Sequence, residues 1–270
     1  MRIIFIGGGN MTRAIVTGLL ATHRANLYVV DRKEASCLAF QQDFNIQAST
    51  TLPAPILASD VIVLAVKPLQ MAAAAASLAA ATHPEHPPLV ISIAAGVYTK
   101  TLSRWLGHQR LVRVMPNTAA TIGLGISGVF SSPSITASDT HLACQIMQAV
   151  GATVQVSQEA DIDSITALSG SGPAYVFYMM ESLMAAARAY GFDAETAQQL
   201  VLTTFKGAVA LAEQSSDDLT VLRQKVTSPK GTTEAALSCF EQEGLADVLK
   251  KGTDAARARA EAIGLELDLN

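Results

Sequence analysis

Charged side chains are scarce in this sequence of 270 residues. Asp, Glu, Lys and Arg make up only 16% of it, whereas an average soluble domain carries about 25%. So few charges cover the surface of a monomer thinly, and we therefore expect part of the apolar surface to be buried against another subunit. The net charge of −4 lacks the basic field that a phosphate backbone requires, which argues against a nucleic-acid-binding protein.

The few charges are unevenly distributed. Residues 1–150 hold 10 basic and 6 acidic side chains, net +4, whereas residues 151–270 hold 9 basic and 17 acidic ones, net −8. The mildly basic first part therefore suits an anionic ligand, and the acidic charge belongs to the second part.

Motifs for metal centres, disulfides and membrane spans are missing. Cys37, Cys144 and Cys239 form no CxxC pair, and the sequence contains neither HExxH nor GxSxG. The alanine-rich stretch over residues 71–81 is too short to cross a bilayer. We therefore expect a cytoplasmic protein with no bound metal and no membrane partner.

Short β-branched runs alternate with helix-forming segments over the first 156 residues. Strands are predicted over residues 2–6, 27–30, 61–65, 89–93, 111–115, 127–130 and 153–156. Helices are predicted over residues 11–21, 34–43, 72–81, 101–106 and 138–150. The alternation indicates an α/β domain of Rossmann type with a mostly parallel, doubly wound sheet. Residues 44–60 stay unassigned because Pro53 and Pro55 interrupt them.

The strand signals stop near residue 160, and only helices follow. They are predicted over residues 173–190, 194–213, 218–227, 232–243 and 246–263. Asp193 is the predicted N-cap of the second helix, and Gly191, Gly244 and Gly264 are predicted helix stops. We therefore expect an α/β domain over residues 1–160 and an all-α domain over residues 161–270.

The first of these helices is apolar nearly all round, since residues 176–180 are Val, Phe, Tyr, Met and Met. Such a helix must be buried on most sides. A partner subunit is the expected cover, and a Met-rich cofactor pocket is the alternative.

A glycine-rich turn opens the first predicted helix. Gly7, Gly8, Gly9, Asn10 and Met11 directly follow Ile6, the end of the first strand. This is the context in which glycines let the backbone approach the pyrophosphate of a dinucleotide. Thr12 occupies the position of the third glycine of the fingerprint, and we expect it to loosen the packing of helix on strand.

The next strand ends in side chains that distinguish two dinucleotides. Asp31 stands where an acid binds the ribose hydroxyls of NAD. Arg32 and Lys33 follow it, and cations there suit the additional phosphate of NADP. The residues alone leave the choice between the two cofactors open.

Small residues follow three further strands on the edge where open α/β sheets bind ligands. They lie in the segments 65–68, 94–96 and 115–118. Small side chains there allow a flat nicotinamide ring to lie close to the backbone. Lys67 is either a phosphate or ribose contact or a solvated lysine.

Two Ser/Thr/Gly segments, residues 168–175 and 226–234, open helices of the second domain. Free N–H groups at a helix start favour an anion such as a small carboxylate, and ordinary capping is the alternative. The sequence offers little acid–base machinery, which fits a substrate that is already activated, such as a protonated imine.

Five segments together resemble the pyrroline-5-carboxylate reductase family from end to end. They are IGGGNM (6–11), AVKP (65–68), RVMPNT (113–118), SGSGPAYVF (169–177) and VTSPKGTTEAAL (226–237). The resemblance implies reduction of 1-pyrroline-5-carboxylate to L-proline, the last step of proline biosynthesis, with NADPH or NADH. It also implies a homodimer through the C-terminal helices and larger rings such as a decamer.

The resemblance and the motifs together give a predicted site. The predicted cofactor contacts are Ile6, Gly7, Gly8, Gly9, Asn10, Met11, Asp31, Arg32, Lys33, Ala65, Val66, Lys67, Pro68, Ala94, Ala95, Gly96 and Asn117. The predicted substrate contacts are Ser228, Gly231, Thr232 and Thr233, with the Thr233 hydroxyl as the catalytic group nearest the imine. The resemblance implies that this second set faces a cofactor held by another subunit.

Three positions depart from the family pattern. Lys230 replaces the usual Gly, Ala119 replaces a Pro, and Asp31 replaces the usual Asn or Ser, which weakens the case for strict use of NADPH. A 3-hydroxyisobutyrate-type dehydrogenase is the alternative enzyme, but Val176 stands where that family has its catalytic Lys. A dinucleotide-binding regulator without turnover is the alternative of another class.

Overall fold

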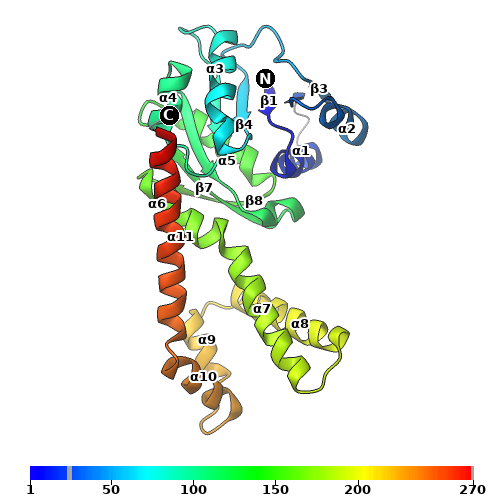
Figure 1. Cartoon of the computed structure of the whole chain (residues 1–270), viewed down its shortest axis with the longest axis vertical. Coiled ribbons are helices and arrows are strands. Elements are labelled where there is room, and N and C mark those ends of the chain that lie inside the picture. The colour runs from blue at the N-terminus through cyan, green and yellow to red at the C-terminus, as the bar shows by residue number, and fades with distance from the viewer. Residues whose placement is uncertain (23–25, 269–270) are drawn as a thin grey trace. The chain divides into compact units, whose positions relative to one another are not determined.

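One eight-stranded sheet organises the N-terminal part of the chain in a computed structural model that describes residues 1–22 and 26–268. Its order is β3-β2-β1-β4-β5-β6-β7-β8, and every neighbouring pair is parallel except β6 and β7. The strands are β1 (Arg2–Ile6), β2 (Asn26–Val30), β3 (Gln47–Ser49), β4 (Val61–Leu64), β5 (Leu89–Ser92), β6 (Leu111–Met115), β7 (Gly125–Ser131) and β8 (Gly151–Val156). The predicted mostly parallel α/β sheet is confirmed (Figure 1).

All seven predicted strands are present, and β3 is the strand that the sequence did not predict. It has three residues at one edge of the sheet, of which only Ala48 is buried. Three residues are too few to establish a period, so the pattern Gln-Ala-Ser does not identify a strand.

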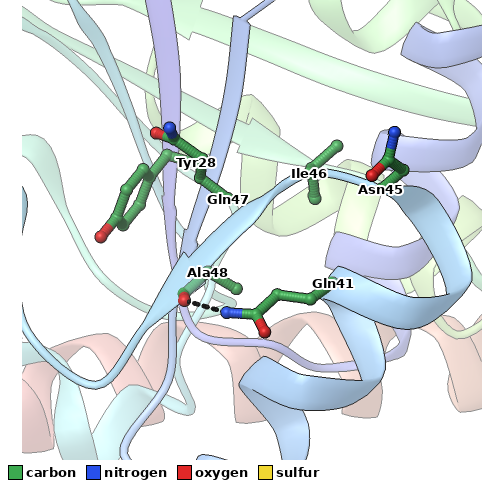
Figure 2. A pocket seen from close by; sticks show the side chains of 6 residues that line it. All are labelled: Tyr28, Gln41, Asn45, Ile46, Gln47 and Ala48. Carbon is green, nitrogen blue, oxygen red and sulfur yellow. Dashed lines mark hydrogen bonds between the residues drawn. The ribbon is translucent and has the colours of Figure 1, made fainter.

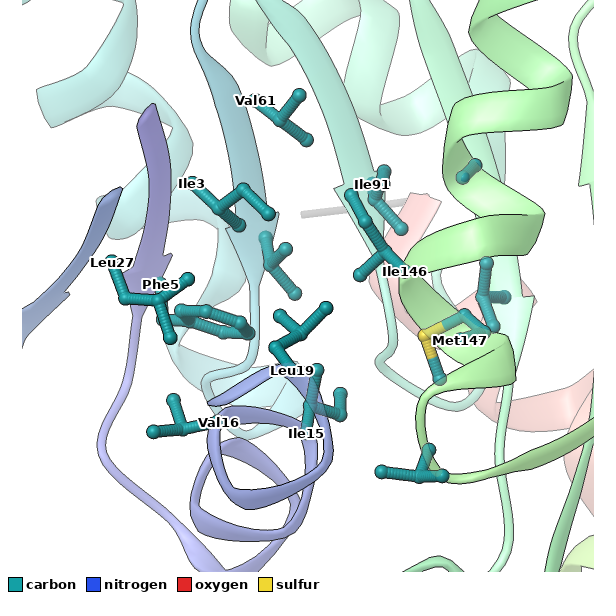
Figure 3. Close-up of a cluster of buried hydrophobic side chains, with 14 of the residues drawn as sticks. Ile3, Phe5, Ile15, Val16, Leu19, Leu27, Val61, Ile91, Ile146 and Met147 are labelled. Carbon is teal, nitrogen blue, oxygen red and sulfur yellow. The ribbon is translucent and has the colours of Figure 1, made fainter. Parts of the chain in front are cut away.

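Helices cover both faces of the sheet. They are α1 (Asn10–Thr22), α2 (Glu34–Phe44), α3 (Met71–Ala81), α4 (Thr99–Leu106), α5 (Ala137–Gln148) and α6 (Ala160–Ile165). Alternate residues of β1 enter two separate apolar clusters: Ile3 and Phe5 pack with α1 and α5, and Ile4 and Ile6 pack with α3 and α4. Figure 3 shows the first cluster, with Ile15, Val16 and Leu19 of α1 beside Phe5. Each fully buried aliphatic side chain contributes about 2 kcal/mol.

The chain forms two compact units, residues 1–173 with 255–268, and residues 174–254. The first unit extends past residue 160 because α6 is tied to it: Tyr98 Oη donates to Asp163 Oδ2 over 3.1 Å. A π-helical turn over Thr166–Gly170 follows α6 within this unit. The predicted domains, 1–160 and 161–270, divide the chain at a different point.

The second unit consists of helices. It contains α7 (Gly172–Ala189) from residue 174 on, α8 (Ala194–Gln214), α9 (Leu219–Lys225), α10 (Thr232–Gln242) and the first part of α11 (Leu245–Asp268). Asp193 caps α8 as predicted, since its Oδ1 accepts from Thr196 N over 2.7 Å. Gly191 and Gly244 adopt φ of 95° and 66°, which fits the predicted stops.

The predicted stop at Gly264 is wrong, because α11 continues to Asp268. Gly264 lies against the ring of Tyr98, and a Cβ there would come within 2.7 Å of Tyr98 Cζ. Thr101 Oγ1 donates to Asp268 Oδ1 over 2.7 Å and holds the last turn. This glycine therefore marks a close approach of helix and ring.

Helix α7 exposes its apolar side chains in the single chain. Val176, Phe177 and Tyr178 are 40%, 65% and 71% exposed, and of its residues only Ala187 is buried. The apolar side chains of this helix, which were predicted to be buried, are therefore not covered by the described residues of the same chain. An exposed apolar surface of this kind marks an interaction site.

The amino edge of the sheet depends on an ion pair that gives a test of stability. Arg110 Nη2 and Nε donate to the two carboxylate oxygens of Asp139 over 2.8 and 3.0 Å. The hydrogen bonds from Arg110 outweigh the effect of burial and hold the pKa of Asp139 below its ordinary value. This pair therefore contributes stability above the ordinary Asp pKa of about 3.9, and the contribution is lost as the pH falls toward the lower folded-state pKa.

We expect Asp139→Asn to lower the free energy of unfolding by about 1 kcal/mol at pH 7, a figure that allows for solvent at the partly exposed Arg110. Urea denaturation of both proteins, repeated from about pH 7 down to about pH 3, measures the difference. The difference should shrink below about pH 4. A constant difference across this range would contradict the assigned role of Asp139.

Candidate functional site

The carboxyl ends of β2, β1, β4 and β5 meet at one edge of the sheet, since these strands are parallel neighbours. The order of strands reverses at β1, whose neighbours β2 and β4 lead to opposite ends of the sheet. Open α/β sheets bind their ligands in the crevice at such a reversal. The site is therefore expected above the end of β1.

The glycine-rich turn fills this position. Gly7 has φ 109°, and a Cβ there would lie 2.7 Å from the carbonyl oxygen of Ala65. A Cβ at Gly8 would lie 2.6 Å from Ser36 Oγ. By contrast, a Cβ at the exposed Gly9 would meet no atom within 4 Å. Gly7 is therefore required by the nearby backbone, a methyl group at Gly8 would displace the Ser36 hydroxyl, and Gly9 leaves open space at the start of α1 for a ligand.

The predicted loosening of the packing of helix on strand at Thr12 finds no support in the structure. Thr12 is fully buried, and its Oγ1 donates to the carbonyl oxygen of Gly7 over 2.6 Å. The hydroxyl therefore joins the first turn of α1 to the glycine loop, a contact that a third glycine lacks.

A cleft of about 960 Å³ lies at this edge of the sheet. Ten predicted cofactor residues line it: Ile6, Gly7, Gly8, Gly9, Asp31, Arg32, Lys33, Ala65, Val66 and Lys67. Further lining residues were not predicted: Val30, Ser36, Thr50, Thr51, Leu52, Leu69, Gln70, Ala73, Ala74 and Ser77. Thr50, Thr51 and Leu52 follow β3, so the unrecognised strand concealed them.

Asp31 is held by backbone N–H groups at the cleft. Its Oδ2 accepts from Gly8 N over 2.7 Å, and its Oδ1 accepts from Lys33 N over 2.9 Å. The carboxylate therefore fixes the glycine loop to the turn after β2. Arg32 and Lys33 are exposed and line the same cleft as the hydroxyls of Ser36, Thr50 and Thr51. Cations and hydroxyls together form a donor set that suits a phosphate.

Other predicted cofactor residues lie outside the lining of this cleft. Among them, Ala94, Ala95 and Gly96 follow β5, the neighbour of β4, on the same edge. Asn117 follows β6, and its Oδ1 accepts from Ile126 N over 3.3 Å. Asn10, Met11 and Pro68 adjoin lining residues in sequence without lining the cleft themselves.

The predicted substrate segment lies in the second unit, at the start of α10. Gly231 is the N-cap residue, and its N–H donates to the carbonyl oxygen of Ser228 over 3.0 Å. Lys230 N donates to Glu234 Oε2 over 2.6 Å. Thr232 and Thr233 occupy the first helical positions. N–H groups of a first helical turn have no partner within the helix, so they are available to an anion.

Lys230 adopts a left-handed backbone with φ 60°. This conformation favours glycine, the residue that the resembled family usually has here. A lysine can occupy the position, at a cost in backbone strain of about 1 kcal/mol.

A separate hollow of about 570 Å³ lies beside β3, lined by Tyr28, Gln41, Asn45, Ile46, Gln47 and Ala48. Figure 2 shows Gln41 Nε2 donating to the carbonyl oxygen of Ala48, a bond of 2.8 Å. Its lining contains amides and a phenol, with no carboxylate, cation or thiol, and we assign no chemistry to it.

Residues 1–22 and 26–268 contain neither a metal-binding cluster nor a membrane-spanning helix. No group of three or more His, Cys, Asp or Glu side chains that could hold a metal ion occurs in this part of the chain. Within the same residues no helix has the length and apolar character needed to span a bilayer.

Two family descriptions match the chain. Residues 159–263 match pyrroline-5-carboxylate reductase dimerisation, and residues 2–96 match NADP oxidoreductase coenzyme F420-dependent. Among curated proteins, the pyrroline-5-carboxylate reductase of Vibrio alginolyticus is 42% identical over 264 residues, 96% of each chain. That of Pseudomonas aeruginosa is 38% identical and covers 98% of each chain.

Solved structures agree with these relatives. The pyrroline-5-carboxylate reductase of Coxiella burnetii matches with a TM-score of 0.90 and 39% identity, over 97% of this chain and 98% of that one. The Plasmodium falciparum pyrroline carboxylate reductase, solved with NADP bound, matches with a TM-score of 0.84 and 27% identity over 98% of each chain.

The glycine turn gives a matched pair of variants. Gly9→Ala adds a methyl group to open space, so it should leave the unfolding free energy unchanged while it weakens NADPH binding about tenfold. Gly7→Ala forces a methyl group toward Ala65 and should cost about 2 kcal/mol of stability or more. Fluorescence titration with NADPH and urea denaturation separate the two effects. Unchanged NADPH affinity in Gly9→Ala would show that no phosphate lies at this turn.

Proposed function

The chain belongs to the pyrroline-5-carboxylate reductase family, and we infer that it transfers hydride from NADPH or NADH to the imine carbon of 1-pyrroline-5-carboxylate to give L-proline. The observation that carries this inference is the agreement of both parts of the chain. The end-to-end relatives are reductases of this one substrate, and the cleft has the glycine turn and cations that a dinucleotide requires.

The cleft fits a dinucleotide on its own geometry. The open space at Gly9 lies at the N-terminus of α1, where free N–H groups and the helix dipole favour a pyrophosphate. Asp31, Arg32 and Lys33 lie on the β2 side of this turn, so we propose that they face the adenosine ribose and its phosphate. The resemblance of residues 2–96 to NADP oxidoreductases and the NADP in the Plasmodium falciparum relative support NADPH as the cofactor.

The other half of the dinucleotide extends in the opposite direction along the sheet edge. Strands β4 and β5 lie on that side of β1, and their loops carry Ala65–Pro68 and Ala94–Gly96. We propose that these small residues contact the second ribose and the nicotinamide, which supplies the hydride when the cofactor is bound.

Residues 226–234, the predicted substrate segment, are proposed to bind pyrroline-5-carboxylate. The N–H groups at the start of α10 and the Ser228 and Thr232 hydroxyls are suited to the carboxylate of pyrroline-5-carboxylate. The Thr233 hydroxyl is proposed to donate a hydrogen bond to the ring nitrogen as that nitrogen becomes an amine. A protonated imine accepts hydride at carbon without further proton transfer, so positioning supplies most of the acceleration.

The helical region is proposed to form the homodimer. Residues 159–263 match a dimerisation family, and the second unit exposes large apolar side chains. These include Phe177, Tyr178, Tyr190, Leu211 and Val226, each at least 64% exposed. We propose residues 161–270 as the substrate-binding and dimerisation domain, residues 1–160 as the cofactor domain, and a cytoplasmic homodimer that can assemble into a ring such as a decamer.

An assay of the purified protein tests the function. Oxidation of NADPH, followed at 340 nm, should depend on added 1-pyrroline-5-carboxylate, and NADH should be compared at equal concentration. If neither dinucleotide is oxidised in the presence of this substrate, the proposed function is wrong.

The role of Thr233 makes a separate prediction. Thr233→Ala should lower kcat by about tenfold or more because it removes one hydrogen bond made to the reacting nitrogen. Thr233→Ser retains the hydroxyl and should retain most of the rate. The affinity for NADPH should be the same in all three proteins, since the cofactor residues lie in the other unit. An unchanged kcat in Thr233→Ala would remove its assigned role.

Lys230 is proposed to be a solvated side chain on the turn rather than a ligand of the substrate carboxylate. Lys230→Gly should then leave the KM for pyrroline-5-carboxylate within about twofold of its original value. It should also stabilise the protein by about 0.5 kcal/mol, because relief of the positive φ exceeds the entropy cost of glycine. A tenfold rise in KM would show instead that the ammonium binds the substrate.

A further inference from the structure

Arg113 is the largest fully buried side chain among the described residues, and full burial is unusual for a cation. It lies in β6, directly opposite Ser92, the last residue of β5. The loop that begins after Ser92 carries Ala94, Ala95 and Gly96. A buried guanidinium therefore lies beside the base of the loop proposed to contact the nicotinamide.

The partners of Arg113 come from two segments that are distant in sequence. Its Nη2 donates to Asp163 Oδ1 over 2.7 Å, and Asp163 is itself 1% exposed. Its Nη1 lies 3.5 Å from Glu159 Oε1. The guanidinium carbon lies 4.9 Å from the centroid of the Tyr98 ring. The Nε atom is buried with no hydrogen-bond partner among the described residues.

The same carboxylates hold the far end of the loop. Tyr98 Oη donates to Asp163 Oδ2 over 3.1 Å, and Glu159 accepts from Thr99 N and Thr99 Oγ1 over 2.7 and 2.8 Å. Burial, reinforced by the charge of Asp163, raises the pKa of Tyr98 to about 12. The hydroxyl therefore stays protonated and keeps donating at neutral pH.

Helix α11 packs against the loop at two points. A Cβ at Gly264 would collide with the Tyr98 ring, and a Cβ at Gly96, which has φ 72°, would lie 2.5 Å from Ile263 Cγ2. Ser92 is paired within the sheet, Tyr98 contacts both Arg113 and Gly264, and Gly96 contacts Ile263. The backbone from Ser92 to Tyr98 is therefore constrained at both ends and in the middle.

Apolar residues could fill this space at less cost in desolvation, since a buried ion pair rarely stabilises a fold more than apolar packing does. The charged groups differ from apolar ones in that they fix the orientation of their partners. A planar guanidinium fixes both the carboxylate in its plane and the ring on its face. The groups held in this way are Asp163 in α6 and Tyr98 at the end of the loop after β5.

We propose that Tyr98, Arg113 and Asp163 are positioning residues for hydride transfer, which hold the loop 93–98 so that the nicotinamide lies at reacting distance from the imine carbon. This inference rests on the proposed contact between that loop and the nicotinamide. Reacting atoms must approach to about 3–3.5 Å, so a small shift of the loop slows the transfer strongly.

Tyr98→Phe is the direct test, since it removes the hydrogen bond to Asp163 and keeps the ring against Arg113 and Gly264. The enzyme–NADPH complex is mixed with saturating pyrroline-5-carboxylate, and a single turnover is followed at 340 nm. We expect the rate constant of the transfer to fall about tenfold. The Kd for NADPH, measured by fluorescence titration without substrate, and the steady-state KM for pyrroline-5-carboxylate should each stay within about twofold of their original values. Loss of folded protein lowers the amplitude of this phase and leaves its rate constant unchanged, so a merely structural role is distinguished.

Tyr28→Phe is the matched control, because it also removes one tyrosine hydroxyl, but from β2, beside the separate hollow of Figure 2. It should keep the original rate constant. Gly264→Ala places a methyl group against the Tyr98 ring and should slow the transfer, although alanine is the better helix former.

An unchanged rate constant in both Tyr98→Phe and Gly264→Ala would overturn the positioning role while the wild-type turnover leaves the proposed function intact. An equal loss in Tyr28→Phe would also overturn it. Absence of turnover in the wild type would instead show that the proposed function, and with it this inference, is wrong.

Discussion

The site depends on the close approach of the backbone at Gly7 to the loop after β4. Gly7 N donates to Val30 O and Ala65 N donates to Ile6 O, each over 2.8 Å, and no side chain fits between Gly7 and Ala65. Strands β2, β1 and β4 are therefore forced to end together, and the cleft opens where they do. The buried Arg113 gives the neighbouring loop after β5 a comparable constraint through ionic and ring contacts.

The two proposed anion sites of the protein have the same local structure. Each is the N-terminus of a helix preceded by glycine and short polar residues, α1 after Gly7–Gly9 and α10 after Ser228–Gly231. The charge distribution supports the first of these sites, since the net charge of residues 1–150 is +4, whereas that of residues 151–270 is −8. The mildly basic part suits a dinucleotide, and the overall scarcity of charge suits a chain whose exposed helical side chains are covered by another subunit.

Much of the fold was predictable because its signals are local. Alternating apolar strands, the caps at Asp193 and Gly191, and the glycine turn each depend on neighbouring residues. The features that the sequence could not predict depend on tertiary contacts. Gly264 lies within α11 because its lack of a side chain leaves room for the Tyr98 ring, and the Thr12 hydroxyl bonds to the glycine loop. Thr50 and Thr51 reach the cleft through an edge strand of three residues, which leaves no periodic pattern.

We infer that hydride passes directly from the cofactor to one carbon of the substrate, and the transfer of deuterium measures this step. The enzyme is incubated with 1-pyrroline-5-carboxylate and NADPH that carries deuterium at the transferable position of C4, and the proline formed is examined by NMR. Direct transfer should give one deuterium per proline, at the ring carbon that adjoins the nitrogen and does not carry the carboxylate. Proline with no deuterium, or with deuterium at another carbon, would show that hydride does not pass directly from NADPH to the imine carbon.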